Sequence, residues 1–254
     1  SLNTVIVNSK SFKWQLGATL GHYKNKITSL PEQNYINKVY GAEIITSVGN
    51  PAGVFYGYKA DGVFASEAEA SKAFGGNDYL KYPTGIQNNP YINFSAGDVH
   101  FCDITPDGII DDKDKTIIGN PHPDFTGGFN ASVQWKNWDL STYLYFSVGN
   151  DIFAMYDYFT AYGSLNSNVT YTRLNNSWDP VTNPNGTYPM WFGVGNDGTE
   201  AKDQGNTQYI HDGSYLRMQT LTLGYSLPNN WIKKAGLSKL RLYVQASNLF
   251  TITK

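Results

Sequence analysis

The sequence predicts an all-β protein built from antiparallel hairpins. Several stretches of about ten residues alternate apolar and polar side chains with a period of two, the pattern of a strand with two unlike faces. Short turns alternate with long polar connections along the chain. Only 16% of the residues are charged, whereas 15% are aromatic, including 19 Tyr. This composition is typical of β-structure with large amphipathic surfaces.

The first predicted hairpin covers residues 1–21. Residues 1–8 are short and β-branched, and Asn8-Ser9-Lys10-Ser11 reads as a tight turn. The next strand places Phe12, Trp14, Leu16, Ala18 and Leu20 on one face and Lys13, Gln15, Gly17, Thr19 and Gly21 on the other. Ten residues is also the length of a tilted strand that crosses a bilayer.

The strongest predicted hairpin joins residues 129–135 to residues 138–146 through the two-residue turn Lys136-Asn137. Apolar and polar residues alternate regularly in both segments. In each segment the apolar residue nearest the turn is a tryptophan, Trp135 or Trp138. Two further strands are predicted near the C-terminal end, at residues 215–227 and from residue 240 onward, with a brief connector at 229–238.

Two long regions, 25–125 and 148–214, lack this regular alternation. Residues 48–64 read as short strands broken by glycine. Ser66 and Glu69 have the spacing of a capping box, which predicts a short helix from Ser66 to about Phe74. The regions contain too many aromatic residues to be linkers, and we expect them to carry structure of their own.

One stretch of the first long region, Asp103–Asp114, has the spacing of an EF-hand calcium loop. Such a loop takes side-chain oxygens from positions 1, 3, 5, 9 and 12 and a backbone carbonyl from position 7, with glycine at position 6. The predicted ligands are therefore Asp103, Thr105, Asp107, the Ile109 carbonyl, Asp111 and Asp114, around a structural Ca²⁺. Ile110 is expected to point away from the ion and to anchor the loop. The alternative is an acidic surface turn, because Asp and Gly are ordinary turn formers.

Other features exclude several classes of protein. A net charge of −2 gives no general attraction to nucleic acid. Cys102 is the only cysteine, so no disulfide can form within the chain. There is no secretory signal and no run of eighteen apolar residues. Because the chain opens and closes on strand-like residues without an initiating Met, we expect it to be a piece of a longer protein.

We expect no enzymatic activity. The four histidines, His22, His100, His122 and His211, have no metal-binding spacing, and no G-x-S-x-G motif is present. Residues 193–198 match G-x-G-x-x-G, but neither a buried strand nor a helix flanks them, so a dinucleotide site is not predicted. Acidic pairs such as Asp151 and Asp157 are expected to be solvated. Tyr156, Tyr158 and Tyr162 either stack on sugars or pack their loops together.

The pattern alone leaves two architectures open. Short turns at one end and long loops at the other are typical of outer-membrane β-barrels, in which Trp14, Trp135, Trp138 and Tyr225 would form the interfacial girdle. A soluble β-sandwich with one face of each strand in its core fits the alternation equally well.

A further signal comes from GDVHFCDITPDGIIDDKDKTIIGNPHPDFTGGFNASVQW, residues 97–135. This segment resembles the C-terminal barrel region of the SusC/RagA family of TonB-linked outer-membrane transporters of Bacteroidetes. Segments 50–64, 149–158, 178–180, 212–228 and 240–254 agree in the same order. The resemblance covers nearly the whole chain. The family usually has Asn-Gly-Asp or similar where this chain has Thr105-Pro106-Asp107, which weakens one proposed ligand.

The resemblance implies that residues 1–254 are an antiparallel transmembrane segment with long extracellular loops, from one barrel of about 22 strands. It implies that the plug domain, the TonB box and the last strands lie outside this chain. The implied function is import of oligosaccharides or peptides through the bacterial outer membrane, with a SusD-like surface lipoprotein as a lid and TonB supplying energy.

The alternative function is that of a calcium-stabilised, secreted β-domain that binds carbohydrate or mediates adhesion. The two functions differ in the surroundings of Phe12, Trp14, Leu16 and Leu20, which face lipid in a barrel and a dry protein core in a sandwich.

Overall fold

The computed structural model describes residues 1–39, 42–157, 170–190 and 205–253. The chain divides into two compact units. The sheet unit contains Ser1–Lys24, His122–Asp151 and Asp212–Lys254, and the insert unit contains Asn25–Pro121 and Ile152–His211. No helix among the described residues is both long and apolar enough to cross a membrane.

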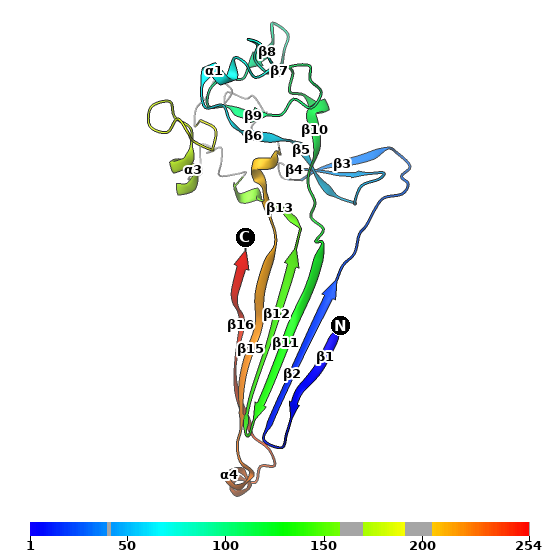
Figure 1. The fold of residues 1–254 in the computed structure, drawn as a ribbon, viewed down its shortest axis with the longest axis vertical. Coiled ribbons are helices and arrows are strands. Elements are labelled where there is room, and N and C mark those ends of the chain that lie inside the picture. The colour runs from blue at the N-terminus through cyan, green and yellow to red at the C-terminus, as the bar shows by residue number, and fades with distance from the viewer. Residues whose placement is uncertain (40–41, 158–169, 191–204, 254) are drawn as a thin grey trace. The chain divides into compact units, whose positions relative to one another are not determined.

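The sheet unit is one antiparallel sheet of six strands in the order β1-β2-β11-β12-β15-β16 (Figure 1). The strands are β1 (Leu2–Asn8), β2 (Phe12–Gly21), β11 (Phe125–Trp135), β12 (Trp138–Val148), β15 (Tyr215–Ser226) and β16 (Arg241–Thr253). Every long strand that the alternation predicts is present. Strand β11 begins earlier than the predicted Phe129, because Thr126, Gly127 and Gly128 pair with β2 although they break the apolar pattern.

All the short turns of this sheet lie at one end (Figure 1). They join β1 to β2, β11 to β12 through Lys136 with φ 54°, and β15 to β16 through α4 (Asn229–Ile232) and a 3₁₀ turn (Lys233–Ala235). We call this the short-turn end. The register pairs Gly21 with Thr126 and Phe125 with Val148, so both long connections leave from the opposite end.

The insert unit contains shorter strands. A four-stranded sheet has the order β10-β5-β4-β3, formed by β3 (Asn34–Val39), β4 (Ala42–Ser47), β5 (Val54–Tyr58) and β10 (Lys115–Gly119). Two-stranded pairs join β6 (Ala60–Val63) to β9 (Val99–Phe101) and β7 (Lys81–Ile86) to β8 (Asn89–Asn93), and β13 (Asp151–Phe153) to β14 (Ile210–Asp212). The remaining elements are α1 (Glu67–Ala70), α3 (Tyr171–Asn176) and the 3₁₀ turns η1 (Asp112–Asp114) and η3 (Thr207–Tyr209).

The insert unit has its own hydrophobic core, as its aromatic content suggested. The buried cluster comprises Tyr58, Phe64, Ala70, Leu80, Tyr82, Phe94, Val99, Phe101 and Ile110. The predicted helix is present but shorter: Ser66 caps it by accepting a hydrogen bond from the Glu69 N–H, and it ends at Ala70. Trp178, which is also buried, donates its indole N–H to the Ala65 carbonyl at 3.1 Å.

Candidate functional site

The six-stranded sheet has one apolar and one polar face. Directly paired residues lie on the same face of a sheet, so each row of partners shows the composition of that face. One row across five strands reads Phe12, Trp135, Trp138, Tyr225, Leu242, and the next reads Trp14, Val133, Leu140, Leu223, Val244. The intervening row reads Lys13, Gln134, Asp139, Gly224, Tyr243. The predicted alternation of residues 12–20, 129–135 and 138–146 is confirmed.

The apolar face is open within the sheet unit. Leu20, Phe129 and Val244 retain 67%, 51% and 75% of their accessible surface. Among residues 1–24, 122–151 and 212–253 no second sheet packs on this face. An uncovered apolar surface across six strands is far larger than the patches that water-soluble monomers carry. The geometry is that of a sheet with lipid on one side.

Aromatic side chains gather at the short-turn end of the apolar face. Trp135, Trp138 and Tyr225 share one row, and the Trp138 and Tyr225 ring centroids are 4.7 Å apart. Trp14, the fourth residue of the predicted girdle, lies in the next row, beside Val133. Trp and Tyr are enriched where hydrocarbon meets head groups, so this row marks an interface of the membrane-spanning band.

The polar face has an ion pair that sequence reasoning missed. Asp139 of β12 and Arg241 of β16 form a bidentate pair across β15, with Arg241 Nε 2.9 Å from Asp139 Oδ1. A Cβ atom on Gly224 would lie 2.4 Å from Arg241 Nη2 and 2.6 Å from Asp139 Oδ1. The glycine therefore provides the space in which two non-adjacent strands are linked. Only the strand register, which the sequence does not contain, brings these three residues together.

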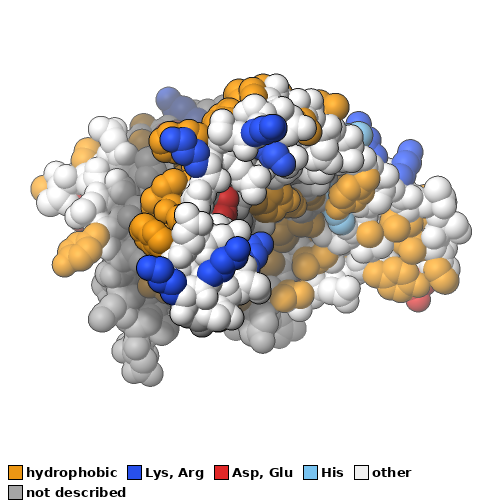
Figure 2. Space-filling view, turned by 90° about the horizontal axis from the view of Figure 1, so that it is seen from below, with side chains coloured by type: hydrophobic (Ala, Val, Ile, Leu, Met, Phe, Trp, Pro, Cys, Tyr) orange, Lys and Arg blue, Asp and Glu red, His pale blue; other side chains and the backbone are white. Residues whose placement is uncertain are grey.

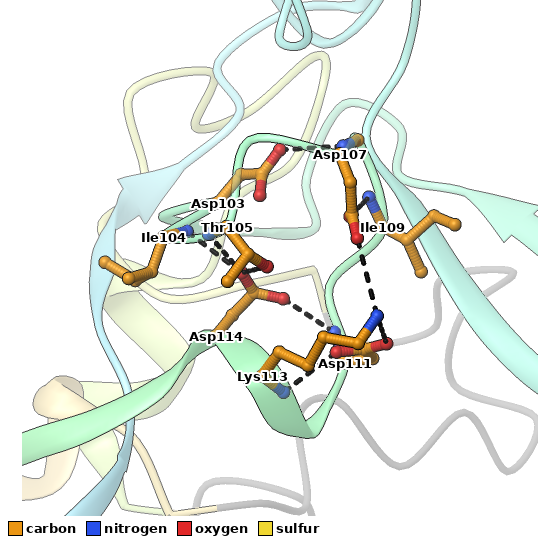
Figure 3. A network of polar contacts seen from close by, with 9 residues as sticks. Asp103, Ile104, Thr105, Asp107, Ile109, Asp111, Lys113 and Asp114 are labelled. Carbon is orange, nitrogen blue, oxygen red and sulfur yellow. Dashed lines mark hydrogen bonds and ion pairs between the residues drawn. The ribbon is translucent and has the colours of Figure 1, made fainter.

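The acidic loop is organised around Asp114 (Figure 3). Its side chain is fully buried. Oδ1 accepts hydrogen bonds from the Ile104 N–H, the Thr105 N–H and the Thr105 hydroxyl, each at 2.9 Å, and Oδ2 accepts from the Asp111 N–H at 2.9 Å. Burial raises the pKa of Asp114, but these donors together lower it by more, so the pKa lies below its usual value and the carboxylate is charged.

The other predicted ligands are distributed around the same turn. Asp103 Oδ2 accepts from the Gly108 N–H at 2.8 Å, while Asp103 Oδ1 is buried and has no hydrogen-bond partner. Asp107 accepts from the Ile109 N–H at 3.0 Å. The Lys113 ammonium lies 3.6 Å from Asp107 Oδ2 and 3.3 Å from Asp111 Oδ2. A lysine thus neutralises two of the carboxylates (Figure 3).

Two predicted features of the loop frame are confirmed. Gly108 has φ +79°, a conformation that favours glycine, and its position faces the Phe74 ring. Ile110 is fully buried in the core of the insert unit. Strand-like bonds hold the loop beside β7: the Ile110 N–H donates to the Lys81 carbonyl at 2.8 Å, and the Lys81 N–H donates to the Gly108 carbonyl at 2.9 Å.

The loop carboxylates face N–H donors more than they face one another. Among the described residues, no group of three or more His, Cys, Asp or Glu side chains is arranged to hold a metal ion. Among the predicted side-chain ligands, all of which are described, the one buried oxygen without a hydrogen-bond partner is Asp103 Oδ1. The calcium site stays a prediction, and hydrogen bonds within the loop already engage most of the carboxylate oxygens of the predicted ligands.

A second polar cluster of the insert unit surrounds Lys115, whose side chain is 7% exposed. Its ammonium lies 3.1 Å from Glu43 and 2.8 Å from Asp112, and it lies over the Tyr58 ring at 5.4 Å. Burial lowers the pKa of Lys115, but the two carboxylates raise it by more. Burial also raises the pKa of Tyr58. Each charge is paired, which is typical of a structural cluster.

The remaining sequence candidates are not brought together. Asp157 pairs with His211 at 3.1 Å on the surface, and Tyr156 is exposed. Residues 193–198, Tyr158 and Tyr162 lie outside the described residues.

The chain is similar to known receptors along its whole length, although no family model matches it. TonB-dependent receptor P3 of Formosa agariphila is 31% identical over 260 residues, which cover 100% of this chain and 24% of the receptor. TonB-dependent receptor SusC of Bacteroides thetaiotaomicron is 26% identical over 259 residues, or 100% of this chain and 22% of SusC. The RagAB peptide importer in its closed-closed state matches with a TM-score of 0.69 at 24% identity, covering 99% of this chain and 25% of that one.

The two-faced antiparallel sheet and the fold match to the RagAB importer define part of a membrane-spanning β-barrel, and the similarity to TonB-dependent receptors assigns it to the outer membrane. More particularly, the chain is related from end to end to TonB-dependent receptors of the SusC and RagA type, so the resemblance inferred from its motifs is confirmed. It spans about a quarter of the length of the curated relatives that it matches.

Proposed function

We propose that this chain forms part of the barrel wall and part of the outer surface of a TonB-dependent nutrient importer. The observation that supports this function best is the six-stranded sheet, apolar and uncovered on one face and polar on the other. In a barrel the apolar face meets lipid and the polar face lines the interior through which a solute passes. The secreted β-domain, the alternative function, requires a second layer over Phe12, Trp14 and Leu16, and none is described in the sheet unit.

The proposed substrates are oligosaccharides or peptides, and the proposed partners are TonB and a SusD-like lipoprotein lid. The insert unit, with its own core, supplies the surface on which such a lid would rest. An importer of this kind does not act on its substrate chemically, which agrees with the absence of a catalytic arrangement in the sequence.

Uptake by cells that express the full-length protein tests this function. Labelled oligosaccharides and peptides should enter only when both the protein and TonB are present, because the transport step needs the energy that TonB supplies. Purification from native membranes should retain a lipoprotein. TonB-independent uptake of both substrate classes, or purification with no second protein bound, would contradict the proposal.

We further propose that the loop Asp103–Asp114 binds one Ca²⁺, which would order the segment leading to β10 and β11. The support is the ligand spacing, the Gly108 turn, the inward Ile110 and the unpartnered Asp103 Oδ1. Oxygen-only ligands favour Ca²⁺ over transition metals, and Mg²⁺ would demand a tighter octahedron.

Limited proteolysis of the full-length protein tests the calcium site. A calcium chelator should raise cleavage within residues 97–120, and Asp107→Ala should have the same effect in calcium. Asp61→Asn is the control, because Asp61 is exposed and the change removes one negative charge of the insert unit without removing a predicted ligand. Asp107→Ala also loses the bond from the Ile109 N–H. The chelator is therefore the deciding treatment, and unchanged cleavage after it would mean that the loop is only an acidic turn.

A further inference from the structure

Basic residues are concentrated at the short-turn end of the sheet. Residues 8–14, 134–140 and 226–242, which contain the three turns and the strand ends beside them, hold seven of the 19 lysines and arginines of the chain and one of its 21 acidic residues. The seven are Lys10, Lys13, Lys136, Lys233, Lys234, Lys239 and Arg241. Figure 2 looks at this end and shows Lys and Arg side chains gathered there beside hydrophobic ones.

The positive charge of this end is not compensated locally. The single acidic residue, Asp139, is paired with Arg241. The six lysines are all exposed, and in the part of the chain that the structure describes none of them forms an ion pair with a carboxylate. Lys136 instead lies over the Trp135 ring, with its nitrogen 5.3 Å from the ring centroid. Lys13 lies on the polar face beside Gln134, so the other five exposed lysines, from three separate turns, form one basic rim.

The rim borders directly on the aromatic row of the apolar face. Trp135 and Trp138 flank Lys136 in the sequence, and Trp231 precedes Lys233 and Lys234. Trp231 is 67% exposed, whereas its neighbour Ile232 is buried. Tryptophan rings sit at the level of lipid head groups, and lysine side chains nearby extend further to place the ammonium among the phosphates.

We propose that the short-turn end binds the phosphate groups of anionic phospholipids in the membrane leaflet that surrounds it. The aromatic row adjoins the basic rim on the lipid-facing side, which favours a bilayer over a soluble polyanion. Lysine suits this partner because its ammonium is a point charge on a flexible stem that follows a mobile head group. The rim is spread over three turns, as a fluid ring of lipids requires, and does not form a pocket for one anion.

Lipid retention by the full-length protein tests the proposal. The protein is embedded in nanodiscs that contain equal amounts of phosphatidylglycerol and phosphatidylcholine, extracted mildly, and the bound lipids are measured by native mass spectrometry. The test variant combines Lys136→Gln, Lys233→Gln, Lys234→Gln and Lys239→Gln. The matched control combines Lys24→Gln, Lys26→Gln, Lys59→Gln and Lys72→Gln, which removes the same charge from exposed sites outside the rim.

Each lysine near an anionic surface contributes about a fivefold preference for anionic lipid. The enrichment of phosphatidylglycerol over phosphatidylcholine should therefore be at least tenfold lower in the test variant than in the unmodified protein. The control variant should keep it, and 0.5 M salt should weaken it in the unmodified protein. Equal retention of the two lipids by the unmodified protein, or equal losses in both variants, would overturn the proposal. Displacement of the lipid by inorganic phosphate alone would also overturn it, because that result indicates a site for a free anion. This readout does not depend on transport, so it is independent of the proposed import function.

Discussion

Leu144→Arg is the substitution that measures how strongly the apolar face depends on lipid. Leu144 lies on β12, six residues from Trp138, and pairs with Phe129 and Met218 on the same face. At about 3.4 Å per residue the distance along the strand is about 20 Å, and a tilt of about 40° reduces it to about 15 Å along the membrane normal. The apolar band is about 25 Å tall, so Leu144 lies near its middle.

An arginine at this depth is expected to cost about 2–4 kcal/mol of folding free energy. Trp138→Arg, at the interface, is expected to cost at most about 1 kcal/mol through its charge. Tyr143→Arg is the matched control, because Tyr143 is adjacent to Leu144 and points to the polar face. It should change stability far less.

The assay is urea-dependent folding of the full-length protein into phospholipid vesicles, followed by tryptophan fluorescence. The midpoint for Leu144→Arg should fall well below that for Tyr143→Arg, with Trp138→Arg between them. If Leu144→Arg and Tyr143→Arg destabilise the protein equally, the apolar face is not in the middle of a bilayer and the reasoning fails.

The remaining predictions concern polar groups. Asp114→Ala should cost roughly 2–4 kcal/mol of local stability, because four donors lose their acceptor, and protease cleavage near residues 103–114 should rise. Gly224→Val should separate Arg241 from Asp139, so Asp139→Asn should lower the unfolding midpoint in the unmodified protein but add little in the Gly224→Val background. Because the pKa of Asp114 is lowered, its stabilisation is present above about pH 3.9 and is lost as the pH falls through the folded-state pKa, so cleavage of the loop should rise in that acidic range. Because the pKa of Lys115 is raised, its stabilisation should be lost only as the pH rises above about 10.4, detectable as a lower melting temperature at that pH.

The long strands were predictable because their signal is local. Period-two alternation over residues 12–20, 129–135 and 138–146 fixes both the strand and its face, and the turn Lys136-Asn137 fixes the register of one hairpin. The start of β11 was missed because Gly127 and Gly128 have neither an apolar nor a polar side chain and so interrupt the alternation. Strands β3 and β4 were missed because six residues with mixed polarity carry little periodic signal.

The candidate sites were only partly predictable, for a different reason. The loop Asp103–Asp114 has a fixed spacing, so Gly108 and Ile110 could be assigned their positions from the sequence alone. Which oxygen meets which N–H depends on side-chain rotation and on burial, and Asp114 uses both of its oxygens on N–H and hydroxyl donors. The pair Asp139–Arg241 joins residues 102 positions apart, and no local pattern indicates it.

The most direct test of the central claim is a scan of nitroxide labels along β12 of the full-length protein in outer-membrane vesicles. Single cysteines are introduced at residues 139–146 in a background in which Cys102 and any other native cysteine are replaced by Ser, and the collision of each label with oxygen and with a water-soluble nickel chelate is measured. A lipid-facing apolar surface predicts high oxygen accessibility at 140, 142, 144 and 146 and higher chelate accessibility at 139, 141, 143 and 145. Low oxygen accessibility at all eight positions, or alternation in the opposite phase, would contradict a membrane-spanning sheet.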